Sequence, residues 1–189
     1  LAWRVREPRQ QYPINEQVLW FQFDAETGQA DPHWYVELAA SGLDRAVLYY
    51  RDPDGRWVSQ EAGDTKAVSA WPLPGRFPTF QLSSQTGQPV RYWLRIEYAR
   101  VNFSAPIAIR HLSSLAISRD REQFLLGTYF GLVVLVTLVA SASALAWRDG
   151  SFASYAVDVA TLGLGQAAYL GTGAQYLWTD FLEWNRVST

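Results

Sequence analysis

Apolar and polar positions alternate with a period of two through much of the first 111 residues, which is the pattern of half-buried β-strands. Turn-forming residues separate the alternating segments, and Asp52-Pro53-Asp54-Gly55 is the strongest hairpin signal among them. The predicted strands cover residues 18–23, 33–38, 45–51, 57–61, 67–70, 79–82, 90–98 and 107–111. Eight short strands at this spacing predict an all-β sandwich of jelly-roll type.

The alternation also assigns a face to each side chain of a strand, because successive side chains point to opposite faces. The large apolar residues that share one face are expected in the core. They are Leu19, Phe21, Phe23, Trp34, Val36, Leu38, Tyr92, Leu94, Ile96 and Tyr98.

The opposite faces of three strands combine aromatic residues with amide and charged groups. An aromatic ring can carry the apolar face of a sugar, while the polar groups exchange hydrogen bonds with its hydroxyls. We therefore predict a ligand-binding surface for a small molecule or glycan; the alternative is that these residues cover a second sheet or an interdomain surface. The candidates are Trp20, Gln22, Tyr35, Glu37, Trp93, Arg95 and Glu97.

Beyond the strands, residues 124–146 form an uncharged run of 23 residues. A helix needs about 20 apolar residues to cross about 30 Å of hydrocarbon, so this run predicts a transmembrane helix. A second segment, 152–178, contains Asp158, Gln166 and several glycines. Such a helix would be poorly placed facing lipid alone, and it is expected to pack inside a larger bundle. The alternative is a re-entrant or peripheral segment.

Composition excludes several classes of function. The net charge of −2 does not provide the basic surface that nucleic-acid binding requires. The absence of cysteine excludes a disulfide framework and thiolate metal sites. His33 and His111 are far apart, and no phosphate loop or nucleophile motif is present, so no catalytic group, cofactor or metal is predicted. Because the chain has no methionine even at position 1, we expect that a signal peptide has been removed or that the chain is an excised piece.

The order of these features resembles the bacterial seven-transmembrane receptors with diverse intracellular signalling modules. The β-rich part is similar to the second type of extracellular sensor domain in that family, a jelly roll like carbohydrate-binding modules. The matching runs, in order, are Val18-Leu19-Trp20-Phe21-Gln22-Phe23, Leu43-Asp44-Arg45-Ala46-Val47-Leu48-Tyr49-Tyr50, Gly63-Asp64, Trp71-Pro72-Leu73-Pro74, Phe80-Gln81-Leu82 and Tyr92-Trp93-Leu94-Arg95-Ile96. In the membrane part they are Tyr129-Phe130-Gly131, Arg148-Asp149, Tyr155, Gly171 and Gln175-Tyr176-Leu177-Trp178.

Residues 1–17, rich in Pro, Arg and Gln, are expected to be an irregular lead-in. The resemblance implies a periplasmic jelly-roll sensor domain over 18–118 and the start of a seven-helix region over 119–189. Helix one is expected at about 122–147 and helix two at about 151–178. The family implies five further helices and an output domain, often a diguanylate cyclase or a histidine kinase, beyond this chain.

Three functions follow as hypotheses. The first is the sensing and transmembrane part of a receptor in the bacterial inner membrane. Its expected partners are a ligand, the membrane and the remaining helices of the receptor, and the sequence leaves dimerisation open. The second is a membrane-anchored carbohydrate- or cell-wall-binding module without signalling. The third is a glycosidase that uses Glu37 and Glu97, which would require the two carboxylates to lie across one cleft.

Overall fold

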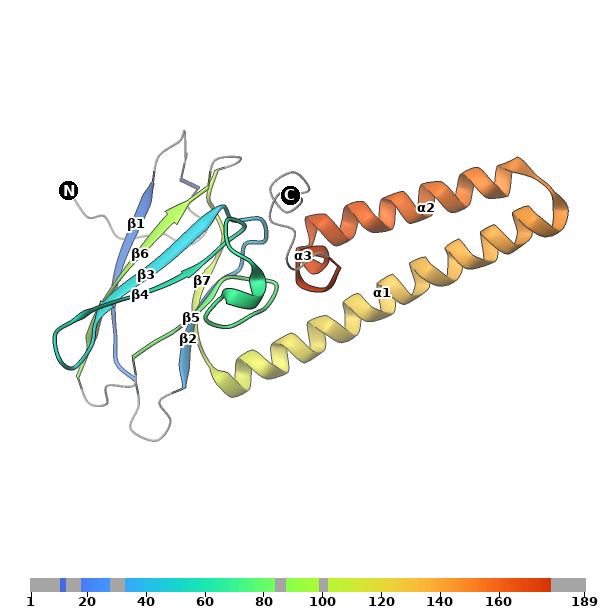
Figure 1. The fold of residues 1–189 in the computed structure, drawn as a ribbon. Coiled ribbons are helices and arrows are strands. Elements are labelled where there is room, and N and C mark those ends of the chain that lie inside the picture. The colour runs from blue at the N-terminus through green and yellow to red at the C-terminus, as the bar shows by residue number, and fades with distance from the viewer. Residues whose placement is uncertain (1–10, 13–17, 28–32, 84–87, 99–101, 178–189) are drawn as a thin grey trace.

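The computed structural model of the chain describes residues 11–12, 18–27, 33–83, 88–98 and 102–177. Its β-rich part contains two antiparallel sheets (Figure 1). One sheet has the order β1-β6-β3-β4 and the other β5-β2-β7. The strands are β1 (Leu19–Ala25), β2 (Trp34–Leu38), β3 (Arg45–Arg51), β4 (Trp57–Ala62), β5 (Thr79–Gln81), β6 (Val90–Glu97) and β7 (Ile107–His111).

The two sheets pack face to face, because one buried cluster takes side chains from both. Val36 and Leu38 come from β2, while Leu48 and Leu94 come from β3 and β6, and all four are fully buried. Burial of apolar surface, at about 25 cal/mol per Å2, is the main force that holds such a sandwich together. The predicted core face is confirmed: of its ten residues, Val36, Leu38, Tyr92, Leu94 and Ile96 are buried, and the other five are partly buried against them.

One predicted strand is wrong. Residues 67–70 do not extend but form η1 (Val68–Ala70), a single turn of 3-10 helix. The turn lets the buried Trp71 side chain reach back, and its indole Nε1 donates a hydrogen bond to the Lys66 carbonyl at 3.0 Å. A segment of only four residues, here three apolar residues interrupted by Ser69, cannot by itself distinguish a strand from a short helical turn.

A helical hairpin follows the sandwich and projects away from it (Figure 1). It consists of α1 (Leu112–Trp147), α2 (Gly150–Tyr169) and the short α3 (Thr172–Tyr176). At the far tip Arg148 adopts a left-handed conformation with φ of 51°, and the Asp149 side chain caps α2 by accepting a hydrogen bond from the Ser151 N–H at 2.8 Å.

The hairpin closes through small residues on α2. Ala156, Gly163 and Ala167 are buried at intervals of seven and four residues, which places them on one helix face. A Cβ at Gly163 would lie 2.7 Å from Cγ1 of Val133 on α1, so any larger residue would force the Val133 side chain or the helices to shift. Close contact through small residues is typical of helices that pack within a membrane.

Among the described residues, α1 is the one helix long and apolar enough to cross a membrane. It has 36 residues, its most apolar window has a mean hydropathy of 2.2, and only 6 % of that window is buried. A helix that apolar and that exposed is poorly suited to water.

Candidate functional site

The outer face of the four-stranded sheet carries one large aromatic residue from each strand. We call these four residues the aromatic band: Trp20 of β1, Trp93 of β6, Tyr49 of β3 and Trp57 of β4. Trp93 and Tyr49 are direct register partners, Trp20 lies opposite Arg95, and Trp57 lies opposite Arg51. Since strands are spaced about 4.8 Å apart, the band crosses roughly 14 Å of sheet.

The rings of the band are in contact in pairs. Trp20 stacks on Tyr49 with centroids 6.0 Å apart, and Trp57 meets Trp93 at 5.2 Å in a tilted arrangement. Trp20 is 40 % exposed and Trp57 57 % exposed. The Arg51 guanidinium lies 4.9 Å from the Trp57 ring centre. Two exposed indole rings beside two half-buried aromatic rings form an apolar patch of the kind that often contacts a partner.

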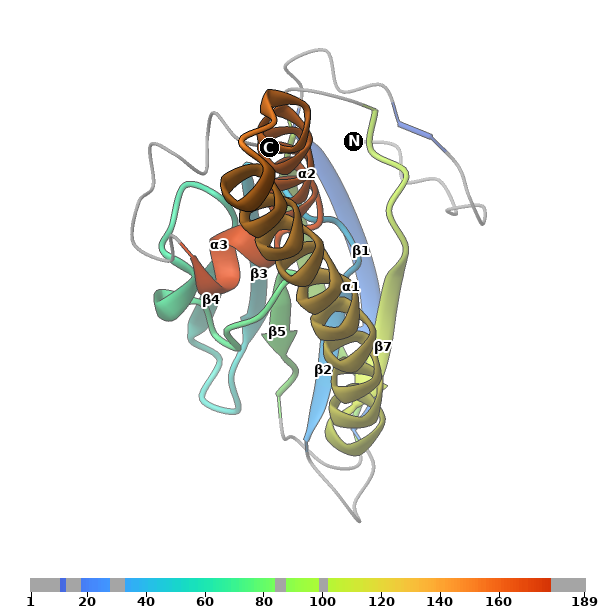
Figure 2. The same ribbon diagram turned by 90° about the vertical axis from the view of Figure 1, so that its right-hand side faces the viewer.

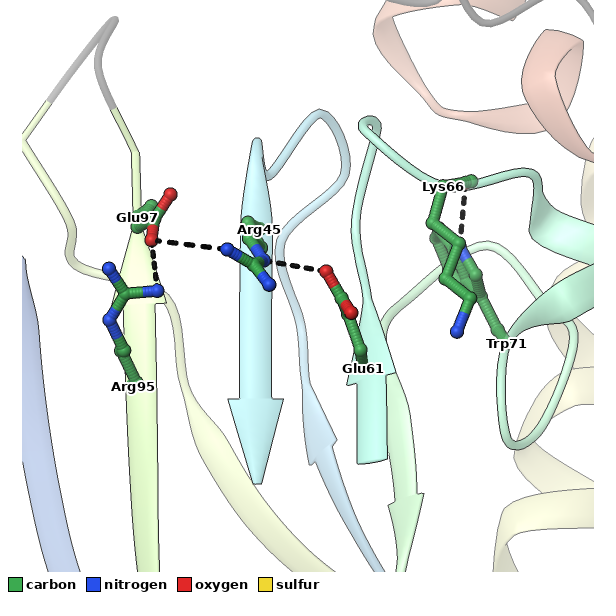
Figure 3. Close-up of polar contacts among 6 residues, drawn as sticks. All are labelled: Arg45, Glu61, Lys66, Trp71, Arg95 and Glu97. Carbon is green, nitrogen blue, oxygen red and sulfur yellow. Dashed lines mark hydrogen bonds and ion pairs between the residues drawn. The ribbon is translucent and has the colours of Figure 1, made fainter. Parts of the chain in front are cut away.

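A chain of ion pairs lies on the same face (Figure 3). Arg45 is bonded to Glu61 at 2.6 Å and lies 3.9 Å from Glu97, which also pairs with Arg95. The hydrogen bond with Glu61 raises the pKa of Arg45 above its usual value. These alternating charges neutralise one another, so they offer polar groups without a strong net field.

The structure separates the seven predicted ligand residues into two groups. Trp20, Gln22, Trp93, Arg95 and Glu97 share the outer face of one sheet.

Tyr35 and Glu37 lie on β2, in the other sheet. There Tyr35 is buried, and Glu37 lies 3.5 Å from Nε of Arg110, at the rim of a cleft beside α1.

Sequence reasoning missed Tyr49 and Trp57. The signal for Tyr49 was available, because it alternates with the apolar Leu48 and shares a strand face with Arg45 and Arg51, although Val47 on that face is buried. Trp57 was harder to assign because it is the first residue of β4, directly after the hairpin turn, so no alternating residue precedes it in the strand.

A second arrangement joins the sandwich to the helices. No residue separates β7 from α1, and the His111 side chain caps the helix by accepting a hydrogen bond from the Ser113 N–H at 3.3 Å. Two turns along α1, Arg119 donates to Oγ1 of Thr79 in β5 at 3.0 Å and to the Pro74 carbonyl at 3.3 Å. Figure 2, which looks along the hairpin toward the sandwich, shows that α1 begins at the end of β7.

The end of α2 returns to the same part of the sandwich. The Ser41 hydroxyl donates to the Tyr169 carbonyl at 3.1 Å, and Arg76 pairs with Glu122 of α1 at 3.6 Å. Gly171 has φ of +72°, and a Cβ there would lie 3.1 Å from Cβ of Ser41 and 3.3 Å from Cγ of Arg76. We call loop 74–77, Ser41, Thr79, Arg119, Glu122 and Gly171 the junction.

Below the junction a cleft of about 790 Å3 opens between the two long helices. Its walls are mainly apolar side chains of α1 and α2, such as Leu126, Phe130 and Leu164. At the end nearest the sandwich, its lining includes Arg76 and Arg119. Within the described ranges, no cluster of three or more His, Asp or Glu side chains is placed to hold a metal ion.

Comparison with known proteins places the β-rich part in a family. The family model described as 7TMR-DISM extracellular 2 matches residues 2–109, which is more than half of the 189 residues. No curated protein and no solved structure matches the chain. The matched region contains six of the seven described strands and most of the seventh, and the aromatic band lies within it. The chain therefore belongs to the 7TMR-DISM extracellular 2 family of receptor sensor domains.

Proposed function

We propose that this chain is the extracytoplasmic sensing and transmembrane part of a bacterial signal-transduction receptor. A ligand binds the aromatic band, and the junction relays binding to the helical hairpin. The continuous passage from β7 into α1 carries this proposal, because a strand that becomes a helix without a linker transmits movement that a flexible tether would lose.

The chemistry of the outer face supports a carbohydrate-like ligand. Exposed indole rings provide apolar contact area, and the neighbouring Gln22, Arg95 and Glu97 provide donors and acceptors for hydroxyl groups. Of the residues predicted from the sequence, the proposed site keeps Trp20, Gln22, Trp93, Arg95 and Glu97, and it adds Tyr49 and Trp57.

The membrane part of the proposal has three elements. The sandwich is a jelly roll in the periplasm, α1 and α2 both cross the inner membrane, and the apolar walls of the cleft between them are covered by the remaining helices of the receptor. The exposed Asp158 of α2 supports a bundle, since a carboxylate facing lipid would be costly. An output domain, a diguanylate cyclase or a histidine kinase, follows in the full receptor.

The test uses the whole chain in lipid nanodiscs. Neutral oligosaccharides and other small solutes are screened by tryptophan fluorescence and thermal shift. Trp57→Ala is expected to weaken binding about tenfold, because burial of a large side chain contributes about 1.5–3 kcal/mol. Trp147→Ala, at the far tip of the hairpin, removes the same side chain away from the band and should bind as the unaltered chain does.

Two results would overturn the proposal. If no solute binds, or if Trp20→Ala and Trp57→Ala bind as tightly as the unaltered chain, the band is not the ligand site. If a ligand binds but hydrogen exchange in α1 stays the same, the chain is an anchored binding module without signalling, since a ligand shifts only those states that it binds unequally.

A further inference from the structure

Gln60 joins the edges of the two sheets. Its side-chain Nε2 donates to the Gln81 carbonyl at 2.7 Å, and its Oε1 accepts from the Gln81 N–H at 2.9 Å. Gln60 lies on β4, the terminal strand of the four-stranded sheet, and Gln81 lies on β5, the terminal strand of the other sheet. The primary amide thus satisfies one backbone N–H and one C=O, as a neighbouring strand would.

This pair of hydrogen bonds lies between the aromatic band and the junction. Trp57 of the band is three residues before Gln60 on the same strand. Thr79 is two residues before Gln81 on β5, and it accepts the hydrogen bond from Arg119 of α1. Two short strands and two hydrogen-bonded contacts therefore connect the outer face to the helix that enters the membrane.

We propose that Gln60 is a positioning residue that couples the aromatic band to α1. It acts by fixing β5 to β4, so that a shift of β4 under a ligand also moves Thr79 and its bond to Arg119. The proposal rests on the proposed function in one respect: it takes the outer face of the four-stranded sheet as the face that binds the ligand. The sheets also share a core, but core packing acts on many strands, whereas the Gln60 amide acts on β5 alone.

The test is a double-mutant cycle read by hydrogen exchange, because coupling is shown by non-additivity. The whole chain in nanodiscs carries Trp57→Ala, Gln60→Ala or both, and exchange is followed at the amides of 115–122. Each single variant should speed exchange there about fivefold, the low end of typical coupling. The double variant should exchange no faster than Gln60→Ala alone. Gln88→Ala, an exposed amide outside the contact, is the matched control and should change nothing.

A second variant tests the hydrogen-bond pattern itself. In Gln60→Glu the ionised carboxylate can accept from the Gln81 N–H but cannot donate to its carbonyl. A protonated carboxyl can do both, so coupling should be lost at neutral pH and restored below about pH 4, near the ordinary pKa of a glutamate. The unaltered chain at the same pH values corrects for all other titrating groups.

The proposal is overturned if the effects of Trp57→Ala and Gln60→Ala multiply, or if exchange in 115–122 is unchanged in Gln60→Ala. It is also overturned if exchange rises equally in every strand, because Gln60 would then only stabilise the sandwich. No ligand is used, so these outcomes are independent of whether the solute screen finds one.

Discussion

Arg119 of α1 donates a hydrogen bond to Oγ1 of Thr79 in β5, and this 3.0 Å contact joins the membrane-type helix to the edge of the sensor sandwich. Thr79 is fully buried, and its hydroxyl also donates to the Phe77 carbonyl at 3.0 Å. The contact therefore lies in a protected environment, where a hydrogen bond to a charged group contributes more than it would at the surface.

Thr79→Val should weaken the attachment of α1 with little change in side-chain volume. The guanidinium of Arg119 would lose its Thr79 acceptor, and a hydrogen bond to a charged group contributes about 1.5–3 kcal/mol. Hydrogen exchange in the first two turns of α1 should rise accordingly, while exchange at the far tip of the hairpin should not. Equal exchange in Thr79→Val and in the unaltered chain would show that Thr79 does not hold the helix.

Gly171→Ala should displace the end of α2 from the sandwich. The left-handed backbone with φ of +72° is unfavourable for alanine by about 1–2 kcal/mol, and its Cβ would press on Ser41 and Arg76. Because the chain has no cysteine, a pair of cysteines placed at Asp54 and Leu177 can carry two spin labels, and the distance between the labels can be measured.

Gly165→Ala is the matched control for that distance. A Cβ at Gly165 meets no atom within 4 Å, and alanine favours a helix. The distance should change in Gly171→Ala and stay constant in Gly165→Ala. A constant distance in both variants would contradict the close packing at Gly171.

The sandwich should lose stability at alkaline pH through Tyr92. Burial raises the pKa of its hydroxyl to about 12 from the ordinary value of about 10. The folded state keeps its proton where the unfolded state has lost it, so this contribution is complete below pH 10 and falls as the pH rises toward 12.

Tyr92→Phe isolates this effect. It removes the hydrogen bond that the Tyr92 hydroxyl accepts from the Ser83 N–H at 2.8 Å, and it should cost about 1–3 kcal/mol at neutral pH. The difference in unfolding free energy between the two chains, measured by urea unfolding in detergent, should shrink between pH 10 and 12. A difference that stays constant with pH would contradict the raised pKa.

Leu135→Arg should impair membrane insertion of α1. Leu135 is 56 % exposed and lies at the middle of the uncharged run, where an arginine costs about 2.5–3.5 kcal/mol. Ile117→Arg places the same charge on an exposed position of the same helix, before that run, and should insert normally. The inserted fraction can be measured by carbonate extraction, and equal insertion of both variants would argue against a membrane-spanning α1.

The periodic features of the fold could be predicted from the sequence. Alternation located the strands and their buried faces, and the uncharged run located the most apolar part of α1. The sequence did not show that α1 begins at Leu112 rather than about 122, because Arg119, Asp120, Arg121 and Glu122 looked like a charged boundary. These charges belong to the part of the helix that docks on the sandwich, where Arg119 and Glu122 have partners.

The candidate site was only half accessible from the sequence because strand pairing is not local. The alternation places Tyr35 and Trp93 on non-core faces equally well, but it cannot say that β2 and β6 belong to different sheets. For the same reason it could not bring Trp57 next to Trp93, or Gln60 next to Gln81. Such contacts depend on tertiary arrangement, which local periodicity does not encode.

The orientation of the chain in the membrane tests the account most directly. Because the chain has no cysteine, Asp54→Cys in the β3–β4 hairpin and Ser151→Cys at the start of α2 can each be labelled alone with a membrane-impermeant maleimide in spheroplasts. We expect the cysteine at 54 to react in intact spheroplasts and the one at 151 to react only after permeabilisation. Labelling at 151 with protection at 54, or equal labelling of both without any membrane association, would contradict a sensor held outside the cytoplasm by α1.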